Sequence, residues 1–189
     1  ISRFYLVLIG AIALIAVAAV ALASREMRTS LARGRVDGQM FLFGLAFLLL
    51  ETKSVTTMSL LWGATWLTCA VVFGAILAMV LAATLVIQWR PLPWAWCMGG
   101  LLVSLVVAYA VPVHLMLRTD ELVRLAFSFA FVGIPIFFAS AGFALLFRDR
   151  PEADHAFGWN LLGAVAGGLL EFSSMLTGIK ALYLAVLAI

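Results

Sequence analysis

The chain contains few charged residues. Of its 189 residues, 11% are Asp, Glu, Lys or Arg and 66% are hydrophobic. An average soluble domain carries about 25% charged residues, so this chain has too little polar surface to cover a water-soluble globule of its size. The composition therefore excludes a soluble domain and predicts an integral membrane protein. The lipid bilayer is its first expected partner.

Cysteine is also scarce, and the residue sets that mark active sites are missing. Cys69 and Cys97 each lie in an apolar stretch without a second cysteine or a histidine at ligand spacing, which argues against a disulfide framework or a metal site. No Ser–His–Asp set and no glycine-rich phosphate loop occurs, so the sequence indicates neither an enzyme active site nor a cofactor. The net charge is +3, but the arginines occupy short connections, so nucleic-acid binding is not predicted.

Long apolar runs fill most of the chain. A spanning helix needs about 20 mostly apolar residues, and the runs predict an all-α polytopic bundle of about seven spans in a single transmembrane domain, residues 1–189. The expected spans are residues 4–23, 40–60, 66–87, 94–115, 122–147 and 156–176, with a truncated seventh from residue 179. Because the chain opens without methionine and stops inside an apolar run, we expect it to be a fragment of a longer polypeptide.

Three ionisable residues fall inside or at the end of predicted spans: Glu51, Lys53 and Glu171. A charge at the centre of a spanning helix costs roughly 2.5–3.5 kcal/mol unless it is paired or faces a polar cavity, so these residues are candidates for a binding site. Glu51 and Lys53 are two residues apart and cannot pair along one stripe of a helix. We expect Lys53 to meet Glu171, or Glu51 to meet an amide or hydroxyl such as Asn160. The alternative is that both residues of the second span are solvated near the interface.

Small and polar residues of the sixth span recur at intervals of three or four, which places them on one helix face. They are Asn160, Gly163, Gly167, Glu171, Ser174 and Gly178. Glycines four residues apart, such as Gly163 and Gly167, allow a neighbouring backbone to approach closely in a membrane. These two glycines, and Gly178 on the same face, are therefore predicted to pack against another helix. The stripe is either a tight helix–helix seam with a buried hydrogen bond or one wall of a polar cavity.

The basic residues are unevenly divided between the two predicted sides of the membrane. One side would carry Arg25, Arg28, Arg33, Arg35, Arg90, Arg148 and Arg150, and the other Arg3, Arg118, Arg124 and Lys180. Because cytoplasmic loops are enriched in Arg and Lys, this bias favours a cytoplasmic first loop.

Three segments of the chain resemble a known family. Residues 43–54 (FGLAFLLLETKS), 61–66 (LWGATW) and 157–171 (FGWNLLGAVAGGLLE) are similar to the spermidine-synthase-like integral membrane proteins, which are fused to major-facilitator-like helices. The similarity covers roughly residues 42–188. Cys69 departs from the family pattern, which has asparagine there. The resemblance implies a bacterial inner membrane as the location and a methyltransferase-like domain upstream. It implies no catalytic activity in these residues.

Two functions are expected from these observations. In the first, the helices anchor the upstream domain and transport a small cationic solute, with Glu51, Lys53, Asn160 and Glu171 as the buried polar core. In the second, the chain is a structural or accessory subunit that packs against other membrane subunits without binding a substrate. The glycine stripe suits either function.

Overall fold

The computed structural model describes residues 3–23, 28–29, 34–90, 92–111, 120–148 and 150–171, and every regular element in these ranges is an α-helix. The helices are α1 (Arg3–Ala23), α3 (Gly38–Trp62), α4 (Trp66–Trp89), α5 (Trp94–Ala110), α6 (Glu121–Arg148) and α7 (Ala153–Glu171). The all-α helical bundle predicted from the apolar runs is confirmed. The predicted seventh span lies outside the described residues.

Three helices are long and apolar enough to cross a membrane. They are Gly38–Trp62, Thr68–Trp89 and Glu121–Arg148, which correspond to the predicted second, third and fifth spans. Shorter apolar helical segments cover Gly10–Leu22 and Trp94–Ala110. The fourth predicted span ends at residue 115 and the sixth at residue 176, so the last part of each lies beyond the described ranges.

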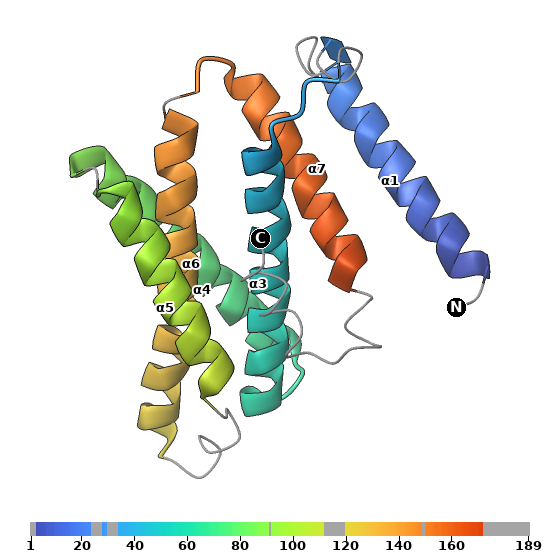
Figure 1. Ribbon diagram of the computed structural model, residues 1–189. Coiled ribbons are helices and arrows are strands. Elements are labelled where there is room, and N and C mark those ends of the chain that lie inside the picture. Colours follow the sequence, from blue (N-terminus) through green and yellow to red (C-terminus); the bar gives the residue numbers. More distant parts are fainter. Residues whose placement is uncertain are drawn as a thin grey trace.

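The helices are arranged around α3 and α6 (Figure 1). Helix α6 packs against α4 and α5, and α3 contacts α4, α6 and, most extensively, α7. Helix α1 packs on the outer side of α7. Long apolar side chains of α1 remain exposed in the chain taken alone, including Val7, Leu14 and Leu22. In a bilayer these side chains face lipid, which suits a chain this apolar.

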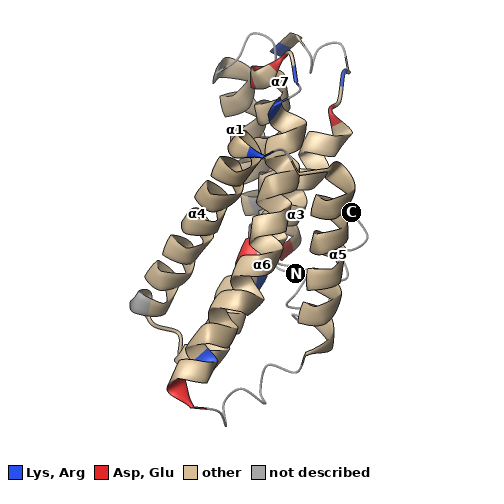
Figure 2. Cartoon of the chain, turned by 90° about the vertical axis from the view of Figure 1, so that its left-hand side faces the viewer, with Lys and Arg blue, Asp and Glu red and all other residues tan. Residues whose placement is uncertain are grey.

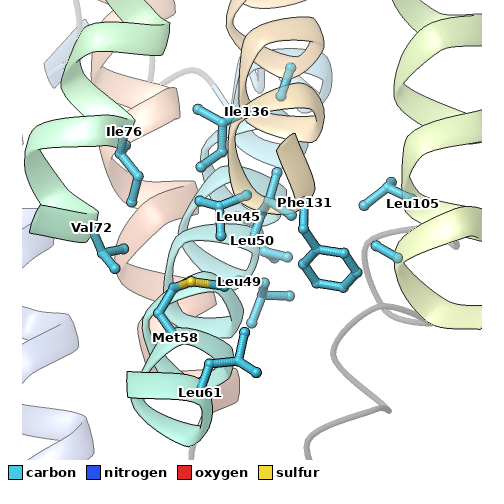
Figure 3. Packing of buried hydrophobic residues seen from close by; sticks show 13 residues of the cluster. Leu45, Leu49, Leu50, Met58, Leu61, Val72, Ile76, Leu105, Phe131 and Ile136 are labelled. Atoms are coloured by element: carbon cyan, nitrogen blue, oxygen red, sulfur yellow. The ribbon is translucent and has the colours of Figure 1, made fainter. Parts of the chain in front are cut away.

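The main core lies between α3, α4, α5 and α6 (Figure 3). Leu49 and Leu50 of α3 are almost fully buried there, next to Ile76 of α4, Leu105 of α5 and Ile136 of α6. Lipid tails are as apolar as these side chains, so close packing rather than withdrawal from water holds such helices together. This core fixes α3, and α3 in turn carries one half of the site described below.

Charged residues gather at the two ends of the bundle, and a few lie midway along it (Figure 2). Successive helices run in opposite directions, so the start of α3, the end of α4 and the connection between α6 and α7 share one end (Figure 1). Arg35, Arg90, Arg148 and Arg150 therefore lie at that end, as the arginine bias predicts for a common side of the membrane.

Candidate site at the contact between α3 and α7

The contact between α3 and α7 brings two helix backbones together. A Cβ atom added to Gly163 would overlap the carbonyl oxygen of Phe41, and one added to Gly167 would lie 2.7 Å from the carbonyl oxygen of Leu45. Real Cβ atoms do not approach backbone oxygens so closely, so neither position has room for a side chain. The two glycines thus pack against the second predicted span.

Helix α3 contributes a glycine of its own to this contact. A Cβ atom on Gly44 would overlap the carbonyl oxygen of Asn160 and would lie 3.0 Å from the backbone nitrogen of Ala164. Sequence reasoning missed Gly44, although a glycine inside an apolar helix can mark the close approach of a neighbouring backbone. We call the contact formed by Gly44, Gly163 and Gly167 the glycine seam.

Two polar side chains link the helices across the glycine seam. Near one end, the Asn160 side-chain nitrogen Nδ2 donates a hydrogen bond to the backbone oxygen of Met40 at 3.3 Å. Near the other, the Thr52 hydroxyl donates to Glu171 Oε2 at 3.1 Å. Asn160 and Glu171 thus both reach the second predicted span, but their partners are Met40 and Thr52. Sequence reasoning missed Thr52, because only the charged residues on either side of it were treated as candidates for the site.

Lys53 lies deep in α3. At about 1.5 Å per residue, it is roughly 22 Å from the start of α3 and roughly 14 Å from its end. Only 7% of Lys53 is exposed, whereas Glu51 is half-buried. The alternative of a solvated interfacial residue therefore does not fit Lys53.

Glu51 and Lys53 point to opposite flanks of Thr52. Residues two apart on an α-helix are separated by about 200° around its axis, so their side chains cannot share a face. The carboxylate of Glu171, bound to Thr52, lies between these two flanks. The direct pairing of Lys53 with Glu171 stays a prediction.

A second link holds the start of α3 to the connection that precedes α7. The side chain of Asp37 caps α3 by accepting a hydrogen bond from Met40 N at 3.2 Å. Its other oxygen, Oδ2, forms an ion pair with Arg150 Nη1 at 3.0 Å, and Arg150 Nη2 donates to Gln39 Oε1 at 2.7 Å. Sequence reasoning missed this clamp. An acidic residue directly before an apolar helix is a known capping signal that could have found Asp37.

Some sequence predictions reach beyond the described ranges or concern metals. Ser174 and Gly178 lie outside the residues that the structure describes. Within the described ranges, no group of three or more His, Cys, Asp or Glu side chains is placed to hold a metal ion.

Comparison of the chain with protein-family models, with curated proteins and with solved structures finds no match. The comparisons therefore assign the chain to no family and add nothing to the geometry of α3 and α7.

Proposed function

We propose that this chain is a membrane-embedded helical domain with an internal site for a proton or a small cation at the α3–α7 contact. The observation that supports this most directly is the hydrogen bond from Thr52 to Glu171. It places a carboxylate of α7 against the middle of α3, between the flanks occupied by Glu51 and Lys53.

The charges of this site favour a cation. Two carboxylates and one ammonium group leave one negative charge when all three are ionised. An uncompensated charge inside a bilayer is costly. Protonating one carboxylate, or binding a cation beside it, would remove this cost. A cationic polyamine is a solute that carboxylates in a cavity would suit, and it is the cation chosen as a probe below.

Transport by reconstituted protein tests this proposal. The protein would be placed in vesicles, with radiolabelled spermidine as one probe and a pH-sensitive dye inside the vesicles as the other. We expect Glu51→Gln and Glu171→Gln each to lower uptake or proton flux about tenfold, since a lost charged partner costs roughly 1.5–3 kcal/mol. Glu152→Gln is the control, because Glu152 is exposed at the end of the bundle. Unchanged flux in both test variants would remove the proposed site.

The resemblance also supports a partner. We propose that a methyltransferase-like domain is encoded upstream, and that these helices anchor it at a bacterial inner membrane. The full-length gene would test this directly. A glycine-rich strand–turn–helix encoded just before Ile1 would support the fusion, and a short independent reading frame would contradict it.

The glycine seam supports a second candidate function. Backbones in direct contact at three glycines favour a fixed helix pair, as a structural or accessory subunit of a membrane complex requires. Purification from native membranes in mild detergent distinguishes the two candidates. A stoichiometric membrane partner, together with absent transport, would favour the accessory subunit.

A further inference from the structure

A groove of about 280 Å³ lies between α4, α6 and the C-terminal end of α3. Its lining changes in character along α4. Thr65 and Thr68 line the groove near the end of the bundle, and Val72 and Ala75 line it further in. Val71 and Phe129 of the same lining are about half exposed, so the groove is open toward the surroundings of the bundle. Figure 3 shows Val72 and Met58 on the inner side of this region.

A cationic side chain is held at the polar end of the groove. The guanidinium of Arg124 lies over the ring of Trp62, with its carbon 4.3 Å from the ring centroid. Trp62 Nε1 donates to Ser128 Oγ at 3.0 Å, and the Ser128 hydroxyl donates to the Arg124 backbone oxygen at 2.8 Å. Trp62 and Ser128 both line the groove, so this network fixes Arg124 beside it.

Arg124 retains hydrogen-bonding capacity. Its Nε atom is buried and has no hydrogen-bond partner among the described residues. A guanidinium presents five N–H donors in a planar fork that matches the oxygens of a phosphate group. The contact with Trp62 is made through the guanidinium carbon over the ring and uses none of these N–H donors.

The dimensions and polarity of the groove match one leaflet of a bilayer. The ten residue-to-residue steps from Thr65 to Ala75 rise about 15 Å, which is half of a hydrocarbon core of about 30 Å. Trp62 and Trp66 at the polar end are of the type that prefers the membrane–water interface. An occupant of this groove therefore needs a long apolar part and an anionic head at the interface.

We propose that the groove binds a phospholipid, with one acyl chain along Met58, Val72 and Ala75 and its phosphate on Arg124. The apolar part of the groove would add nothing to the binding of free phosphate, and Arg124 would add nothing to the binding of an uncharged chain. A phospholipid would bind the apolar lining with its acyl chain and Arg124 with its phosphate. This site is separate from the α3–α7 contact.

Native mass spectrometry of the detergent-purified protein, titrated with dioleoyl phosphatidylglycerol, measures this binding. We expect Arg124→Gln to weaken the lipid affinity about tenfold, because it removes a charge-assisted contact to phosphate. Ala75→Phe fills the apolar part and should weaken affinity by a similar factor while leaving Arg124 in place. The matched controls are Arg90→Gln at the opposite end of α4 and Ala78→Phe on its exposed face. Both controls should bind lipid as the unaltered chain does.

Three results would overturn the proposal. The first is an affinity that neither test variant changes more than its control. The second is inorganic phosphate competing as strongly as a phospholipid, which would reduce the site to an anion site. The third is a lower melting temperature for Arg124→Gln with unchanged lipid affinity, which would make Arg124 only a support for Trp62. Should Arg124→Gln fail to fold, Ala75→Phe still decides the outcome.

Discussion

The contacts of α3 with α7 differ in kind from the contacts of α6 with α4 and α5. At the glycine seam, the atoms nearest to Gly44 and Gly163 are backbone atoms of the facing helix. On α6, the nearest atoms to Gly133 and Gly142 belong to the methionine side chains of α4 and α5, Met79 and Met98. A backbone cannot move aside without shifting a whole helix, whereas a methionine changes rotamer easily. The first contact is therefore rigid and the second adaptable.

This difference bears on function. The proposed site needs partners that stay in place, and the rigid pair of α3 and α7 holds Thr52 against Glu171. The adaptable contacts around α6 leave that helix more able to shift. If the domain moves a solute, we expect the motion to occur between α6 and its neighbours, with α3 and α7 moving as one unit.

The largest effect is expected from a side chain placed in the rigid contact. Gly163→Ala should lower the free energy of unfolding by about 3 kcal/mol or more, because the new Cβ overlaps the Phe41 carbonyl oxygen. Unfolding in mixed micelles of increasing denaturing detergent measures this. Gly74→Ala on α4 is the control, since a Cβ there meets nothing within 4 Å. A loss below about 1 kcal/mol for Gly163→Ala would show that the two helices separate freely.

A smaller loss is expected when the end of this pair is released. Asp37→Ala removes both the cap of α3 and the ion pair with Arg150, and should lower stability by about 2 kcal/mol. The same unfolding assay applies. Glu152→Ala is the comparison, because its ion pair with Arg35 spans 3.8 Å between exposed side chains and should contribute less than about 1 kcal/mol. Equal losses in the two variants would contradict a special role for the Asp37 clamp.

The hydrogen bond across the seam should have a modest effect. Thr52→Val keeps the shape of the side chain but removes the donor to Glu171. It should lower the free energy of unfolding by about 0.6 kcal/mol, the average for hydrogen bonds between membrane helices. Thr56→Val is the control, since the Thr56 hydroxyl donates only within its own helix, to the Thr52 carbonyl oxygen. A double-mutant cycle of Thr52→Val with Glu171→Gln should be non-additive. Full additivity would mean that the two side chains do not interact.

The smallest effect is expected in the adaptable contact. Gly142→Ala brings a Cβ to 2.5 Å from the terminal methyl carbon of Met98, which can move away. We expect the free energy of unfolding to stay within about 0.5 kcal/mol of that of the unaltered chain, because a methionine side chain adapts to irregular spaces at little cost. A loss as large as that of Gly163→Ala would erase the distinction between the two kinds of contact.

Much of the candidate site could be predicted from the sequence, but its pairings could not. The period of small residues in the sixth predicted span put Asn160, Gly163 and Gly167 on one face, and the structure places that face against α3. Which residues they meet depends on the register between two helices. A shift of one turn would exchange Thr52 for another partner without changing any periodic pattern. For this reason the sequence did not indicate that Thr52 binds Glu171. The pairing of Lys53 with Glu171 stays a prediction.

Composition alone determined that this chain forms apolar helices, because a backbone in lipid must satisfy its own hydrogen bonds and so few charges cannot cover a soluble surface. The periodicity of glycine and polar residues determined which face of the sixth predicted span would pack. Only the tertiary structure decided that Gly44 completes the glycine seam and that Asp37 and Arg150 clamp its end. Such contacts join residues about 110 to 120 positions apart, and the relative position of two packed helices follows from the fit of all their side chains together.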